Sequence, residues 1–181
     1  NHQSGILDFI SDFCQASRLV PREIEAFFRI FSQFMAVAEP AQNGKTEWVK
    51  ASAFLIGTSI YKPELYHQIG QGKATPTEVE TYIKGLPYGK SGFDSPERYF
   101  LFLAMSFLLR NTDDGEEMRE IALICLNFEG EVFPGAMEED QAIAGMLRDL
   151  RRDIDDRMHI YKQSTFQQLY SMIEDWRPFI E

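Results

Sequence analysis

The sequence predicts an all-α protein, an irregular multi-helical bundle of about nine helices with no sheet. Apolar residues recur three and four positions apart in one stretch after another, which is the spacing of a single helix face. Several of these stretches begin with proline or with a serine or threonine that can cap a helix. No stretch shows sustained alternation of apolar and polar residues with the β-branched enrichment of strands. Helices packed on helices are therefore expected.

Five helices are expected in the first half, over residues 6–16, 21–38, 47–61, 63–69 and 76–84. The second begins at Pro21, whose missing N–H costs nothing in a first turn. Its broad apolar stripe suggests that the chain is organised around it: Ile24, Phe27, Phe28, Phe31, Phe34, Met35 and Ala38. Thr46 and Pro63 can begin the next two helices, and Thr75-Pro76-Thr77-Glu78 is a capping-box sequence before the fifth. Residues 1–5 and 39–45 are expected to be a loose lead-in and a loop.

Four helices are expected in the second half, over residues 96–109, 118–128, 138–159 and 166–180. Ser95-Pro96-Glu97 begins the first by the same capping logic, and residues 99–109 are apolar almost all round, as in a central buried helix. Residues 118–128 form an amphipathic stretch after a turn. Acidic residues 138–140 lie in the first turn of the third helix, where the helix dipole favours negative charge. Apolar residues from Phe166 to Ile180 form the stripe of the last helix.

The Gly- and Pro-rich stretch 85–92 is the best candidate linker. It separates a helical, lid-like subdomain over 1–84 from an acidic helical subdomain over 93–181, unless the two pack as one continuous domain. Charge changes at the same place, because residues 1–92 carry 9 basic and 9 acidic residues and residues 93–181 carry 9 and 19. The net charge of −10 therefore belongs to the second half. Solvated surface helices are the simplest reason for it, and a basic partner is the alternative.

The composition argues against several classes of partner. An acidic chain is poorly suited to nucleic-acid backbones and to anionic membranes. The most apolar run, residues 100–109, is too short for the roughly 20 residues of a membrane span, so direct membrane insertion is not expected. Cys14 and Cys125 give no disulfide framework and are expected to be reduced core thiols. The first residue is Asn, which is compatible with a piece of a longer protein.

Motifs with possible chemistry are incomplete. Gly44-Lys45-Thr46 matches only the end of a phosphate-binding loop, because position 39 is Glu where the pattern requires glycine. Residues 111–117 resemble a calcium loop, but its twelfth position would be Ala122 instead of glutamate, so a turn and a helix start are favoured. The three histidines, His2, His67 and His159, lack zinc-ligand spacing, and a Cys–His pair assembled by the fold stays open.

Acidic and basic residues alternate along residues 148–157. The aspartates lie four positions from arginines, in the pairs Asp153–Arg157, Arg151–Asp155 and Arg152–Asp156. That spacing favours solvated ion pairs over a metal site or paired catalytic carboxylates. We therefore predict no catalytic residues and no metal site in this chain.

Two stretches carry a resemblance to a known family. Residues 19–31 read Leu-Val-Pro-Arg-Glu-Ile-Glu-Ala-Phe-Phe-Arg-Ile-Phe, and residues 54–66 read Phe-Leu-Ile-Gly-Thr-Ser-Ile-Tyr-Lys-Pro-Glu-Leu-Tyr. Together they resemble the helical carboxy-terminal region of KAP family P-loop NTPases, over residues 18–69. The resemblance does not extend beyond residue 93.

The resemblance implies an accessory region of a larger ATPase, which couples nucleotide state to a partner and is not catalytic alone. ATP and Mg²⁺ would bind the parent's NTPase core, with no cofactor held by this fragment. It also implies a cytoplasmic protein, held at the membrane by parts outside this chain, with roles in signalling scaffolds or in bacterial phage exclusion. Arg22 is similar in position to a lid arginine ("sensor 2") that reaches the γ-phosphate; a solvated first-turn residue is the alternative.

Two further functions stay open from the residues alone. One is a free-standing helical module that binds a protein partner in a groove between aromatic-rich helices. The other is a small helical enzyme with a site assembled from scattered residues. The sequence does not indicate an oligomeric state.

Overall fold

The computed structural model describes residues 2–42, 46–87, 96–133, 135–155 and 165–176. Over these residues the chain folds into nine α-helices and no strand, which confirms the all-α prediction. The helices are α1 (His2–Ala16), α2 (Pro21–Gln42), α3 (Thr46–Tyr61), α4 (Pro63–Gly70), α5 (Pro76–Lys84), α6 (Pro96–Leu109), α7 (Gly115–Glu129), α8 (Ala136–Asp155) and α9 (Phe166–Trp176).

Local sequence signals account for most helix starts. Thr75 and Glu78 form the predicted capping box, in which the Glu78 N–H donates to Thr75 Oγ1 over 3.2 Å and the Thr75 N–H donates to Glu78 Oε2 over 2.8 Å. Asp114 caps α7 by accepting from the backbone N–H groups of residues 116 and 117. Thr165 and Gln168 exchange the same pair of bonds at the start of α9.

Two stretches that were predicted to be irregular are helical in part. Residues 2–5 belong to α1 instead of forming a loose lead-in, and α2 continues through residues 39–42, where a loop was expected. Alanines at 36, 38 and 41 are strong helix formers. Pro40 stands in the last turn of α2, where the helix continues for only two more residues after the bond that its missing N–H removes.

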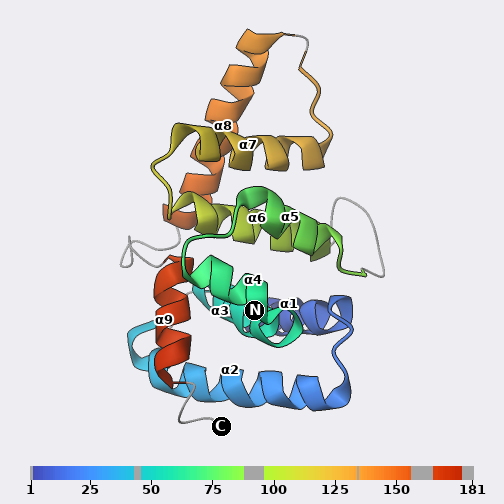
Figure 1. Cartoon of the computed structure of the whole chain (residues 1–181), viewed down its shortest axis with the longest axis vertical. Helices are drawn as coiled ribbons and strands as arrows, with labels where there is room; N and C mark the ends of the chain where they lie inside the picture. Colours follow the sequence, from blue (N-terminus) through green and yellow to red (C-terminus); the bar gives the residue numbers. More distant parts are fainter. Residues whose placement is uncertain (1, 43–45, 88–95, 134, 156–164, 177–181) are drawn as a thin grey trace.

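The helices stack along one long axis (Figure 1). α2 lies at one end, α1, α3 and α4 form the next level, α5 and α6 follow, and α7 crosses α8 at the other end. α9 runs along the side and contacts α3 and α4, although about 100 residues separate it from them in the chain. α5 contacts α6 and α7, so helices on either side of residues 85–92 touch at several places. The division into two subdomains stays a prediction about folding units.

α3 is the central helix of the fold. All its side chains from Trp48 to Ser59 are buried. Its hydroxyls are satisfied within the helix, since Ser52 Oγ donates to the Trp48 carbonyl over 2.9 Å and Thr58 Oγ1 to the Phe54 carbonyl over 2.7 Å. Lys50 donates to the Tyr99 hydroxyl and lies 4.4 Å from the centre of that ring. These hydrogen bonds allow polar side chains of α3 to be buried.

Candidate functional site

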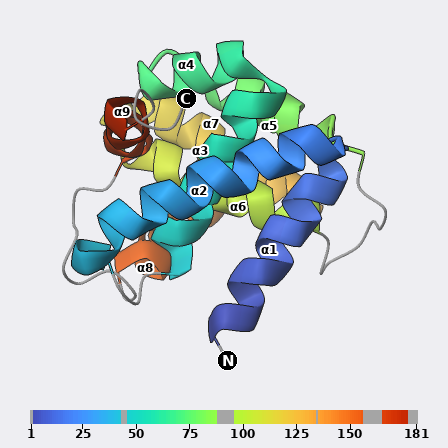
Figure 2. The same ribbon diagram turned by 90° about the horizontal axis from the view of Figure 1, so that it is seen from below.

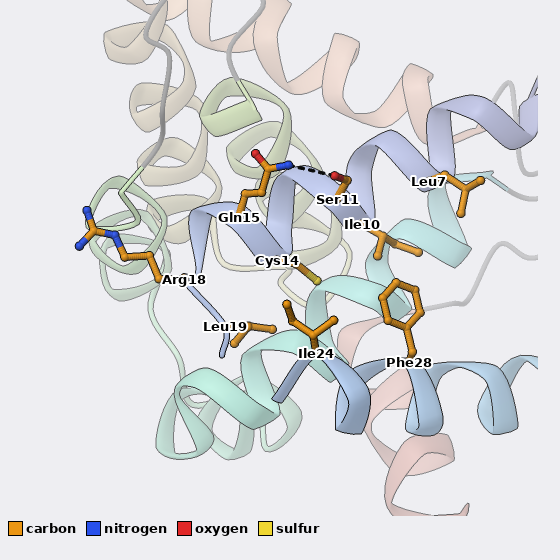
Figure 3. Close-up of a pocket in the computed structure, with 9 residues that line it drawn as sticks. All are labelled: Leu7, Ile10, Ser11, Cys14, Gln15, Arg18, Leu19, Ile24 and Phe28. Carbon is orange, nitrogen blue, oxygen red and sulfur yellow. Dashed lines mark hydrogen bonds between the residues drawn. The ribbon is translucent and has the colours of Figure 1, made fainter. Parts of the chain in front are cut away.

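A cleft opens between α1 and α2. Both helices contact α3, and they diverge from the corner formed by residues 17–20 (Figure 2). The cleft has a volume of about 430 Å³, within the usual range of binding pockets. The residues that line it come from α1, the corner and the start of α2: Leu7, Ile10, Ser11, Cys14, Gln15, Arg18, Leu19, Ile24 and Phe28 (Figure 3).

The walls of the cleft are apolar and partly open to solvent. Leu7, Ile10 and Cys14 lie three and four positions apart on α1 and form one ridge. Ile10 is buried, whereas Leu7 is 63% exposed and Phe28 is 42% exposed at the mouth. Gln15 Nε2 donates to Ser11 Oγ over 3.1 Å at the polar edge of α1. The cleft thus presents large apolar groups to solvent beside a few polar ones.

The corner of the cleft is a helix-terminating turn of defined geometry. The Leu19 N–H donates to the Cys14 carbonyl over 3.2 Å, and the Arg18 N–H donates to the Gln15 carbonyl over 3.1 Å. These two bonds define a Schellman motif with Arg18 in the left-handed position, at φ 49°. In this motif the two positions that usually make an apolar contact are occupied here by Cys14 and Leu19, and both residues line the cleft.

An arginine is an unusual residue at this position. The ends of α4 and α7 carry the same pair of bonds, and there the left-handed residues are Gly72 (φ 66°) and Gly130 (φ 77°). A side chain in this conformation costs about 1–2 kcal/mol, which glycine avoids. Among the described residues, Arg18 is the only non-glycine residue with a positive φ. Strain of this kind is retained where the surroundings hold it, and it is often found at functional positions.

Two positively charged residues lie at or near the corner of the cleft. Arg18 and Arg22 are exposed, and neither makes an ion pair with a residue that the structure describes. Glu23 follows Arg22 in the first turn of α2, and its carboxylate accepts the Val20 N–H over 2.9 Å. The Arg18 guanidinium extends away from the apolar walls at the closed end of the cleft (Figure 3). A group at the end of a bound molecule could meet it there.

The predicted nucleotide contact, Arg22, lies in the first turn of α2 as expected. It is exposed near the cleft but does not line it, and its proposed role stays a prediction. Gly44 and Lys45 of the partial phosphate loop lie outside the described residues. Asp114 and the residues around it form a turn and a helix start, as the sequence favoured over a calcium loop.

The remaining candidate residues are not brought together within the described part of the chain. His67 Nδ1 lies 3.0 Å from the Tyr170 hydroxyl, while the side chain of His2 and all of His159 lie outside the described residues. The pairs Asp153–Arg157, Arg151–Asp155 and Arg152–Asp156 also include side chains outside them. Across the described residues, no group of three or more His, Cys, Asp or Glu side chains is placed to hold a metal ion.

The two cysteines are free and buried. Burial raises the pKa of the Cys14 thiol and raises that of Cys125 to about 12, because a thiolate is poorly solvated inside the protein. Both are therefore neutral thiols at physiological pH. Cys14 differs in that it lines the cleft, with 8% of its surface exposed.

Sequence reasoning did not find the cleft. It identified the apolar stripe of α2, which includes Phe28, but the spacing of a stripe does not show which of its residues the fold leaves exposed. One signal was present: the turn after Ala16 has no glycine, although a helix ends there.

No family model matches the chain, and comparisons with curated proteins and with solved structures find no significant match. Within the described residues, no helix combines the length and the apolar character needed to cross a membrane.

Proposed function

We propose that the chain is a helical protein-interaction module whose cleft between α1 and α2 receives an amphipathic helix of a protein partner. The observation that carries this proposal is the apolar ridge of Leu7, Ile10 and Cys14, which faces Phe28 across an open cleft. Side chains spaced three and four apart on a third helix can pack into such a seam. Covering Leu7 and Phe28 would remove exposed apolar surface from water.

The charges next to the cleft favour a protein partner over a lipid surface. Exposed charged residues of both signs lie among the lining residues or next to them in sequence: Asp8, Arg18, Arg22, Glu25 and Arg29. An anionic membrane attracts clusters of positively charged residues, whereas these charges are mixed and the chain as a whole carries a net charge of −10. Mixed charges around an apolar centre are typical of protein interfaces, where they select partner and register.

A display library of helical peptides selected against the purified chain tests the proposal. We expect enriched peptides with apolar residues three and four positions apart. Leu7→Glu and Phe28→Glu should each weaken the binding of such a peptide by about tenfold or more, because a carboxylate would be placed in the apolar contact. Both side chains are partly exposed, so the variants should still fold.

The matched control is Val132→Glu, which places the same charge on a residue that is 87% exposed between α7 and α8. Binding to this variant should stay within about twofold of the wild type, as for most surface changes. Equal loss in all three variants, or selection of no amphipathic peptide, would overturn the proposal. Displacement of the peptide by myristate would instead assign the cleft to an anionic amphiphile and would also overturn it.

A second candidate, suggested by the KAP resemblance, is that the docked helix belongs to an NTPase core and that Arg22 contacts the nucleotide. The exposure of Arg22 beside the cleft supports it. Arg22→Ala should then leave folding intact and impair ATP hydrolysis in a longer protein that contains the core. Unchanged turnover there would remove Arg22 from this function.

A further inference from the structure

We infer that the corner of the cleft recognises the acidic carboxyl end of the docked helix, and that Arg18 determines this specificity. The inference rests on the proposed function and adds the orientation and chemistry of the partner. It starts from the place of Arg18, which lies at the closed end of the cleft with its guanidinium beyond the apolar walls. A helix lying along the cleft would bring one of its ends to this point.

The charge at the corner favours a carboxyl end. The carboxyl end of α1 and the amino end of α2 meet there, so the partial negative charge of one helix end offsets the partial positive charge of the other. Over residues 17–24, Arg18 and Arg22 contribute two positive charges and Glu23 one negative charge, so this segment is net positive. A helix carboxyl end carries a partial negative charge and unpaired carbonyl groups, and both are stabilised by arginine.

The opposite end of the cleft has the complementary character. Asp8 is exposed beside Leu7 at the mouth, so a docked helix with its carboxyl end at the corner would place its amino end near this carboxylate. The reversed orientation would place like charges together at both ends. The two ends of the cleft therefore favour the same orientation.

The backbone of Arg18 is an independent argument. Glycine occupies the same position in the equivalent turns after α4 and α7, yet the cleft has an arginine in the left-handed conformation. A contribution of the side chain to binding would account for this choice, because the left-handed conformation disfavours any residue with a side chain. Stability and binding would then impose opposite demands on one residue.

Selections against the wild type, Arg18→Glu and Arg148→Glu test the inference. Arg148 is an exposed residue of α8, so its reversal changes the net charge equally but away from the cleft. Peptides selected by the wild type and by Arg148→Glu should carry Asp or Glu in their last turn, whereas Arg18→Glu should select Lys or Arg there. A peptide with an acidic last turn should bind Arg18→Glu about tenfold more weakly than Arg148→Glu at low salt.

The outcomes separate this inference from the proposed function. If all three proteins select amphipathic helices without a charge preference in the last turn, the orientation is wrong and the docking cleft stands. If acidic residues are enriched in the first turn of the peptides, the orientation is reversed and the inference is overturned. If the wild type selects no amphipathic helix, both proposals fail.

Discussion

At the scale of single residues, three turns of one geometry allow a direct comparison. Gly72 and Gly130 adopt the left-handed conformation without a side-chain penalty, whereas Arg18 adopts it at a cost. A Cβ at residue 130 would have no atom within 4 Å, so a substitution there reports the backbone penalty alone. Residue 130 is therefore the natural reference for residue 18.

Exchanging the two residue types should move stability in opposite directions. We expect Arg18→Gly to stabilise the fold by about 1 kcal/mol and Gly130→Arg to destabilise it by a similar amount. The first substitution removes a side chain from a left-handed position, and the second introduces one there. Urea unfolding followed by circular dichroism measures both. Arg18→Gly should also bind the acidic peptide more weakly, and a variant that is less stable than the wild type would contradict the assignment of strain to Arg18.

The thiols provide a second test at this scale. Since burial raises the pKa of both cysteines, the thiolate that reacts with iodoacetamide is rare in the native state. Alkylation at about pH 8 should therefore be far slower in the native protein than in denaturant, and slowest for Cys125. Mass spectrometry resolves the two sites. A docked peptide should protect Cys14 further, while rapid native labelling of Cys125 would contradict its burial.

At the scale of elements, α1 can pack close to α3 because residue 57 of α3 is a glycine. A Cβ at Gly57 would lie 2.0 Å from Phe13 Cε1, so the ring of Phe13 occupies the place of a side chain at residue 57. Phe13 also makes edge contacts with Phe54 and Phe100, with ring centres 5.8 and 5.5 Å apart. This packing sets the position of α1 and, with it, one wall of the cleft.

Gly57→Ala should displace Phe13 and destabilise the protein by about 1–3 kcal/mol, as overpacking does in other cores. Thermal unfolding measures the loss. The matched control is Gly145→Ala in α8, where a Cβ meets nothing within 4 Å and alanine should stabilise the helix by about 0.5–1 kcal/mol. Equal effects of the two substitutions would mean that Phe13 does not hold α1 in place.

At the scale of the whole molecule, one apolar cluster includes buried residues from all nine helices that the structure describes. Phe166 of α9 is fully buried, and its ring stacks on Phe54 of α3 at 6.0 Å and on Phe107 of α6 at 5.0 Å. Tyr66 of α4 donates to Glu174 of α9 over 2.9 Å. The last helix thus joins elements from both sides of residues 85–92.

Phe166→Ala should destabilise the protein by about 3–5 kcal/mol, because it leaves a cavity between three helices. If residues 1–84 and 93–181 form one cooperative unit, hydrogen exchange should accelerate equally in α3 and α6. Ser171→Ala, at an exposed position of α9, is the control and should change neither. Acceleration confined to α9 would contradict a single unit and support the two subdomains that the linker composition suggests.

Much of the secondary structure could be predicted from local signals. Pro21, Pro63 and the Thr75 capping box mark helix starts whose chemistry depends only on neighbouring residues. The cleft could not be predicted, because an apolar helix face has the same spacing whether another helix covers it or not. Leu7 and Ile10 belong to one stripe, yet only Ile10 is buried.

The sequence by itself determined the all-α class, the order of the helices and most of their starts, since helix periodicity and capping act over a few residues. The tertiary structure alone decided that α3 is buried on all sides, that α9 packs on helices far away in the chain, and that α1 and α2 diverge at Arg18. These features depend on which apolar faces of the nine described helices pack against one another. The choice of packing partners is a property of the whole core, and no single stretch of the chain specifies it.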